Sequence, residues 1–363
     1  MKSSVDNAQS LKFEKEHTLI TKGILIILML VHHVLNSSFR YQHNVQTLIK
    51  NDSLLTNIVS MGSICVSGFA FLSAYGMTQS LKAKKDLPYD TCFKWMCIRL
   101  IKLESSIVFI FFLAVFYKRI ILQESIGAVY GVESGGDKIL LLLLNAIGMS
   151  DYFGTPNINM TWWYLHFAII LIITMPFLYM LYEKFRYLLI PAVCVLPMAI
   201  FSLETMAGAQ NNYIILLPST LLGIAFAYED WFEKLKQLNC KILKVFIPII
   251  ILILAYYVWT NLGNRFAYIF VVVLPFIVYE FIAGIPILSS VLKFIGEHAT
   301  NIFLIHTFIY LYWYADFIYS FQKSWLIIGV LLIICIILSV MIELLKKISG
   351  YNRLITKIVH KIE

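Results

Sequence analysis

Ten apolar runs, each long enough to cross a bilayer as a helix, occupy most of this sequence. A membrane-spanning helix needs about 20 predominantly apolar residues. The sequence does not show the alternating ten-residue patterns that are typical of outer-membrane barrels. It therefore predicts an all-α polytopic membrane bundle with spans at residues 18–36, 56–79, 99–119, 161–182, 186–203, 213–229, 243–261, 265–283, 296–318 and 324–345.

Composition agrees with this class, because only 14% of the residues are charged whereas a soluble domain carries about 25%. An eleventh apolar run, at 138–149, is too short to cross and is expected to form a re-entrant or interfacial helix. No polar stretch is long enough for a soluble domain. We therefore expect residues 1–363 to form one domain embedded in the lipid bilayer.

The basic residues predict orientation rather than a nucleic-acid partner. Cytoplasmic loops of membrane proteins are enriched in Lys and Arg. With ten crossings, 22 of the 29 Lys and Arg residues fall on the side of the N-terminus, so both termini are predicted to be cytoplasmic. Lys118 and Arg119 are local exceptions on the outer side. The first run lacks a signal-peptide cleavage site and is expected to remain as a span.

Cysteine spacing argues against a redox or metal site. The six cysteines include no Cys-x-x-Cys pair, so we expect reduced thiols and no metal. They are Cys65, Cys92, Cys97, Cys194, Cys240 and Cys335.

The first run carries the strongest candidate site, which is Lys22 followed eleven residues later by His33. On a helix these side chains lie about 20° apart in azimuth and roughly 16 Å apart along the axis. Ionisable groups on a membrane helix are costly unless they face a protein interior or an aqueous cavity. We therefore expect this face to line a working site. The alternative is that His32 and His33 mark the membrane boundary.

Four later segments carry polar or aromatic groups at helical spacing. Arg99 and Lys102 share one face and are suited to phosphate, unless they only anchor the helix in the cytoplasm. Ser67 and Tyr75 carry hydroxyls on the second run. Trp162 and Trp163 form an aromatic belt at the membrane interface or, with His166 on the same face, the wall of an outward cavity that stacks on sugar rings. His306, near mid-membrane, is either a functional group or a neutral structural imidazole. Glu280 and Glu343 are expected to face lipid headgroups.

Together these motifs resemble the membrane acyltransferase 3 family of bacterial O-acyltransferases. The matching features follow the family's order and span nearly the whole chain. They are Lys22 and His33 separated by ten residues, Ser67-Gly68-Phe69, Tyr75-Gly76, Arg99-x-x-Lys102, Trp162-Trp163-Tyr164, and the segment 294–306 that ends at His306.

The resemblance implies a multi-pass enzyme of the bacterial inner membrane. Such enzymes transfer an acyl group, usually acetyl, from cytoplasmic acetyl-CoA or another acyl-CoA to a hydroxyl of a cell-surface glycan or lipid-linked sugar. The family's essential histidine corresponds to His33 and its basic residue to Lys22. Its usual Arg-x-x-Arg pair is here Arg99 and Lys102, a departure in phosphate geometry. Many members add a periplasmic esterase-like domain, and without one this chain is expected to be a stand-alone transferase.

The resemblance implies a mechanism in which His33 is the base. The acceptor hydroxyl then attacks the thioester directly, or the acyl group passes through an acyl-histidine intermediate. Lys22, Arg99 and Lys102 hold the coenzyme A phosphates. Contacts with the acceptor are expected from Trp162, Trp163, His166, Tyr75 and His306. The rival function is a transporter or flippase for a glycan or polyisoprenoid-linked sugar, with His and Lys as a proton relay. The acceptor's identity, the acyl length and the oligomeric state are not predicted.

Overall fold

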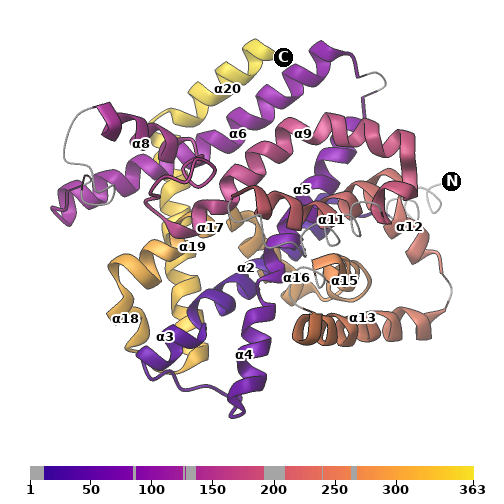
Figure 1. Ribbon diagram of the computed structural model, residues 1–363, viewed down its shortest axis with the longest axis horizontal. Helices are drawn as coiled ribbons and strands as arrows, with labels where there is room; N and C mark the ends of the chain where they lie inside the picture. Colours follow the sequence, from indigo (N-terminus) through magenta and orange to yellow (C-terminus); the bar gives the residue numbers. More distant parts are fainter. Residues whose placement is uncertain are drawn as a thin grey trace.

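The computed structural model describes residues 12–84, 87–125, 127, 136–191, 209–238, 240–262 and 268–363. Every regular element within these ranges is a helix (Figure 1), so the predicted all-α class is confirmed. Six helical segments are long and apolar enough to cross a membrane. They are Lys15–Val34, Asp52–Lys82, Tyr89–Ile121, Met160–Pro191, Ile242–Asn261 and Ser324–Ile348, and two shorter apolar segments are Ile215–Tyr228 and Ile269–Ile282. The protein is therefore a multi-pass membrane protein.

In chain order the elements are α2 (Lys15–Val34), α3 (Ser37–Gln42), α4 (Asp52–Met61), α5 (Ile64–Lys82), α6 (Tyr89–Phe116), η1 (Tyr117–Ile121), α8 (Gly136–Ala146), η2 (Met160–Trp162), α9 (Trp163–Phe185), η3 (Arg186–Leu188), α11 (Ala209–Tyr228), α12 (Trp231–Lys236), α13 (Lys241–Leu262), η4 (Tyr268–Val272), α15 (Val273–Ile277), η5 (Val278–Ile282), α16 (Pro286–Glu297), α17 (Ala299–Thr307), η6 (Phe308–Trp313), α18 (Ala315–Tyr319), α19 (Ser324–Ile348) and α20 (Tyr351–Ile362).

Several expected spans differ from these helices. The run at 296–318 is divided among α17, η6 and α18, with a break at Tyr314. The run at 265–283 forms a shorter apolar helix, Ile269–Ile282, whose winding changes along η4, α15 and η5. Most of the run at 186–203 lies outside the described residues. The short run at 138–149 corresponds to α8. Because hydropathy counts apolar residues without locating breaks in a helix, it did not separate these pieces.

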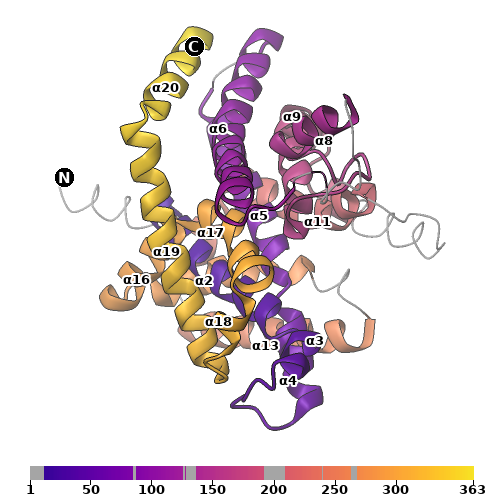
Figure 2. The ribbon, with the colours of Figure 1, turned by 90° about the vertical axis from the view of Figure 1, so that its left-hand side faces the viewer.

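The amphipathic α20 was not predicted as a separate helix. Figure 2 shows it continuing from α19 and running beside α6. Gly350 separates α19 from α20 with a φ of 75°, which favours glycine because it has no Cβ. Tyr351 at the start of α20 donates a hydrogen bond to the carbonyl of Ser105 on α6 at 2.9 Å.

α2 lies in the middle of the molecule and crosses α16 at a pair of glycines. A Cβ on Gly23 would lie 2.1 Å from the carbonyl oxygen of Leu292, and one on Gly296 would lie 1.9 Å from that of Leu19. Small residues at such crossings let two backbones approach closely within a membrane. This crossing determines which face of α2 is left for the site.

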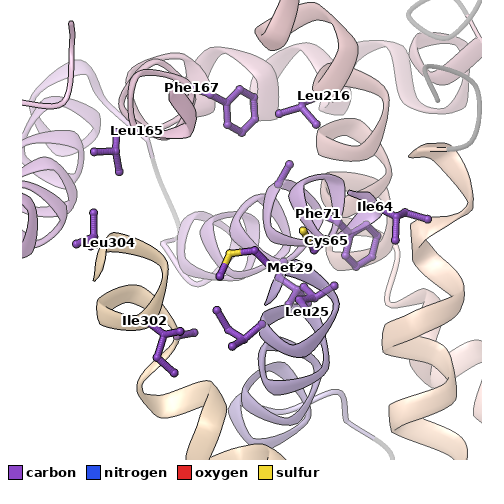
Figure 3. Packing of buried hydrophobic residues seen from close by; sticks show 14 of the residues in the cluster. Leu25, Met29, Ile64, Cys65, Phe71, Leu165, Phe167, Leu216, Ile302 and Leu304 are labelled. Atoms are coloured by element: carbon purple, nitrogen blue, oxygen red, sulfur yellow. The ribbon is translucent and has the colours of Figure 1, made fainter. Parts of the chain in front are cut away.

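α5 approaches its neighbours closely at two glycines. A Cβ on Gly68 would lie 2.5 Å from Leu25 Cδ2, and one on Gly223 of α11 would lie 2.4 Å from the carbonyl oxygen of Phe71. Figure 3 shows Leu25 and Met29 of α2 packed beside the part of α5 that carries Phe71. The core thus joins α2, α5 and α11.

Glu280 does not face lipid headgroups, so that expectation was wrong. Its side chain is only 8% exposed and forms an ion pair with Lys244 at 3.3 Å. Glu343 is partly exposed, but it accepts hydrogen bonds from Asn301 and Lys346, both at 2.9 Å. Both carboxylates therefore have partners, as expected because an isolated buried charge is costly.

Candidate active site

Two adjoining cavities follow the face of α2 that carries Lys22 and His33. The larger, which we call the mouth, has a volume of about 1060 Å³ and is lined by Lys22. The smaller, which we call the chamber, has a volume of about 250 Å³ and is lined by both Lys22 and His33. The lining residues common to both are Lys22, Ser73, Leu103, Ala168 and Thr300. The cavities therefore form one path along α2.

The mouth is strongly basic. Lys22 from α2 lines it together with Arg99 and Lys102 from α6, and Lys84 and Lys94 also line it. The spacing predicted only that Arg99 and Lys102 share a helical face. The one acidic residue among the lining side chains is Glu363, whose backbone carbonyl accepts a hydrogen bond from Lys94 at 3.2 Å. Such a concentration of cations in a concave site favours an anionic ligand.

Arg99 is oriented by an aromatic neighbour. Its guanidinium carbon lies 5.2 Å from the ring centroid of Trp95, within the range of a cation–π interaction. Trp95 is itself held by a hydrogen bond from its indole nitrogen to Ser80 at 3.0 Å. The planar guanidinium is therefore braced at the edge of the mouth, in a form suited to phosphate.

His32 and His33 differ although they are adjacent. His32 Nδ1 lies 2.9 Å from the carbonyl oxygen of Val59, and this contact requires the ring to donate because a carbonyl only accepts. Among the described residues, no hydrogen-bond partner occupies the ring nitrogens of His33, which faces the chamber. His32 also lines the chamber, but one of its ring nitrogens is taken up by Val59, so His33 is the histidine with both nitrogens open to a ligand in the described part of the chain.

Aromatic rings pack behind His33. Its centroid lies 5.2 Å from that of His306 and 6.4 Å from that of Tyr310. Beyond Tyr310, Phe39 and then Tyr319 follow at centroid distances of 6.0 and 6.4 Å. Tyr319 donates a hydrogen bond to the carbonyl of Val34, at the C-terminal end of α2. We call Tyr310, Phe39 and Tyr319 the ring row.

His306 belongs to a polar chain rather than to the cavity lining. Its Nδ1 donates toward the carbonyl oxygens of Ile302 and Phe303 at 3.1 and 2.8 Å. Its Nε2 lies 3.2 Å from the hydroxyl of Thr307, which lies 2.9 Å from that of Thr161. His306 is fully buried. It therefore contacts His33 and not the chamber directly.

Of the predicted aromatic cluster, Trp163 and Tyr164 line the chamber, whereas Trp162 and His166 do not. Trp162 is fully buried and donates its indole hydrogen to the carbonyl of Leu304 at 3.1 Å. His166 is also buried, with Nδ1 at 3.4 Å from Asp151 Oδ2. Trp162 and His166 are four residues apart and share one helical face, which is turned away from the chamber. Trp163 lies about 100° from Trp162 around the helix and points into the chamber.

Tyr75 also lies away from both cavities. It is buried among aromatic rings, with centroid distances of 5.1 Å to Phe13 and 5.6 Å to Phe232. Its hydroxyl accepts a hydrogen bond from Gln79 at 3.3 Å. We therefore do not place Tyr75, Trp162 or His166 in contact with substrate.

Several residues of the two cavities were not predicted from the sequence. Lys84 and Lys94 were counted only for orientation, and Trp95 was not considered. Thr161 directly precedes the aromatic cluster Trp162-Trp163-Tyr164 and was not recognised as a candidate. Ser63 lines the chamber, and its hydroxyl is buried without a hydrogen-bond partner in the described part of the chain. Helical spacing gives no signal for Ser63, because it lies at the junction of α4 and α5.

Comparison with known proteins gives the family. The model of the acyltransferase domain of the acyltransferase 3 family matches residues 20–344, which is nearly the whole chain and includes every residue named above that lines the chamber. No curated protein and no solved structure matches the chain. This protein therefore belongs to the acyltransferase 3 family and is an acyltransferase.

Proposed function

We propose that the protein is an O-acetyltransferase that uses acetyl-CoA to acylate a hydroxyl of a cell-surface glycan or lipid-linked saccharide. The observation that carries this proposal is the continuous path from the basic mouth to the chamber of His33. A transferase of this kind needs a grip on an anionic donor, a route for its thioester and a base for the acceptor. The path supplies these in that order.

Arg99, Lys102 and Lys22 hold the phosphates of the donor at the mouth. Coenzyme A carries several phosphate charges, and Arg binds such groups through two parallel hydrogen bonds. Lys84 and Lys94 add positive charge around them. The pantetheine arm then runs along α2 over the roughly 16 Å between Lys22 and His33. This brings the thioester into the chamber.

His33 acts as the general base in the chamber. The acceptor hydroxyl gives its proton to a ring nitrogen of His33 as its oxygen attacks the thioester carbonyl carbon. The carbon–sulfur bond then breaks, and the proton passes from His33 to the departing sulfur. The products are the acetyl ester and coenzyme A. Ser63, with its unpartnered hydroxyl in the same chamber, is the donor available to the oxyanion.

The acceptor is on the opposite side of the membrane from the donor. The basic residues of the mouth belong to the charge-rich side assigned to the cytoplasm of a bacterial inner membrane. His33 lies eleven residues further along α2, so the chamber is in the outer half of the bilayer. Hydroxyls available there are those of surface glycans and of sugars carried on lipids.

The test is transfer of label. Purified protein in vesicles, given acetyl-CoA labelled in the acetyl group and a saccharide acceptor, should place the label covalently on the saccharide. Movement of unlabelled saccharide across the vesicle membrane, without transfer of label, would support a transporter and reject the proposal. Hydrolysis of acetyl-CoA that is the same with and without saccharide would also reject it.

A further inference from the structure

Thr161 begins a chain of hydrogen-bonding groups that leads from the wall of the chamber to His306. Thr161 lines the chamber, and its Oγ1 lies 2.8 Å from Asn159 Oδ1 and 2.9 Å from Thr307 Oγ1. Thr307 Oγ1 in turn lies 3.2 Å from His306 Nε2. Thr161 is 4% exposed and the other three residues are fully buried. Bulk water therefore does not compete for these contacts.

Two atoms at the ends of the chain have fixed hydrogen-bonding roles, namely His306 Nδ1 as a donor and Asn159 Oδ1 as an acceptor. His306 Nδ1 faces two backbone carbonyl oxygens, so it carries a hydrogen. Asn159 Oδ1 accepts the backbone N–H of Thr161 at 3.0 Å as the cap of η2. A flipped amide would set the hydrogens of Asn159 against that N–H. Asn159 Oδ1 is therefore an acceptor.

The number of donor hydrogens in the chain determines which hydrogen-bonding role remains for the hydroxyl of Thr161. A threonine hydroxyl has one hydrogen. If His306 Nε2 lacks a proton, Thr307 donates to it, and Thr161 donates to Thr307 or to Asn159. If Nε2 carries a proton, it donates to Thr307, which donates to Thr161, which donates to Asn159. In both states the hydrogen of Thr161 is used within the protein, and its oxygen has only a lone pair left.

We propose that Thr161 positions the acceptor by accepting a hydrogen bond from a hydroxyl that is not itself acylated. This inference rests on the proposed function and names a positioning residue for the acceptor. A thioester carbonyl or an ionised phosphate has only acceptor atoms and cannot bond to this lone pair. A saccharide with a second hydroxyl can, because Thr161 and His33 line the same chamber. Thr161 therefore sets which hydroxyl of the saccharide is presented to His33.

The experiment pairs variants of Thr161 with acceptors that lack single hydroxyls. The full-length protein is assayed with the parent saccharide and with each of its monodeoxy analogues. One analogue should react with the wild type about tenfold more slowly in kcat/KM, the effect of one hydrogen bond. Thr161→Val should lose about the same factor on the parent and should no longer distinguish that analogue. Thr161→Ser should behave as the wild type, and KM for acetyl-CoA should not change.

Thr220→Val is the matched control. Thr220 is a buried threonine that donates to the carbonyl of Leu216 at 3.0 Å and lines neither cavity, so this variant reports the effect of losing a buried threonine hydroxyl away from the site. If Thr161→Val still distinguishes the analogues, the inference is wrong. If it raises KM for acetyl-CoA instead, Thr161 binds an amide of the pantetheine arm and the inference is also wrong. Absence of transfer by the wild type would instead reject the proposed function.

Discussion

At the scale of single residues, His32 and His33 are neighbours on α2 that both line the chamber. One ring nitrogen of His32 is bound to the carbonyl of Val59, whereas the ring nitrogens of His33 have no hydrogen-bond partner among the described residues. We expect His33→Ala to abolish acetyl transfer because the reaction loses its base, while His32→Ala removes one hydrogen bond, worth about 0.5–1.5 kcal/mol of stability, and keeps most activity. Label transfer by each variant, after correction for the amount of folded protein, measures this. An equal loss in both would contradict the assignment of His33.

Arg99 and Lys102 give a second prediction at this scale. Arg99→Ala should raise KM for acetyl-CoA roughly tenfold to a hundredfold, because a hydrogen bond to a charged group contributes about 1.5–3 kcal/mol. Lys102→Ala should raise this KM less, because an ammonium group cannot bind phosphate through two parallel hydrogen bonds as a guanidinium does. Steady-state kinetics with each substrate varied in turn would show this. Unchanged KM for the donor in both variants would leave these residues as membrane anchors only.

Prediction from the sequence succeeded where the geometry is local. The relative placement of Lys22 and His33 depends only on the rise and turn of one helix, so it followed from spacing. The direction in which Trp162 and His166 point depends on how α9 is rotated against α17, which no spacing within α9 encodes. Thr161 is informative only beside Asn159 and Thr307, and Thr307 comes from another part of the chain.

At the scale of helices, the crossing of α2 and α16 holds the site in register. Gly23→Ala should destabilise the protein by about 1–3 kcal/mol, the usual cost of overpacking, because its Cβ would meet a backbone carbonyl oxygen at 2.1 Å. Activity should fall as well, since α2 carries both Lys22 and His33. Thermal unfolding in detergent and label transfer together measure the effect.

Gly329→Ala is the control for this crossing. Gly329 lies in α19, and a Cβ there would meet no atom within 4 Å. Alanine is the better helix former, so this variant should be as stable as the wild type or slightly more so. If the two glycine variants behave alike, close packing of α2 on α16 is not what holds the site.

Helix breaks were the part of the fold that hydropathy did not predict. The division of residues 296–318 into α17, η6 and α18 involves residues as apolar as those of a continuous span. η6 follows Thr307, the residue whose hydroxyl joins His306 to Thr161. Such breaks are tolerated within a membrane where neighbouring helices cover the backbone, and that covering is a tertiary property.

At the scale of the whole molecule, donor and acceptor should enter from opposite sides. In oriented vesicles, acetyl-CoA supplied to the cytoplasmic face should acetylate an acceptor confined to the other face. In a protein without its native cysteines, a thiol reagent should reach Lys84→Cys from the cytoplasmic face alone, and coenzyme A should block it. At Asn36→Cys, beyond the end of α2, acceptor should give the protection instead. Transfer that requires both substrates on the cytoplasmic face would rule out this arrangement.

The ring row behind His33 has a consequence for ion conduction. The mouth and the chamber together form a cavity that runs along α2 into the bundle and is basic at its mouth. Tyr310 and Tyr319 are buried on the far side of His33 and line neither cavity. These rings therefore fill the part of the bundle behind His33. We expect the protein in vesicles to conduct no ions through this part of the bundle while the ring row stays packed, so that a leak, if one is measured, follows the route of the acceptor.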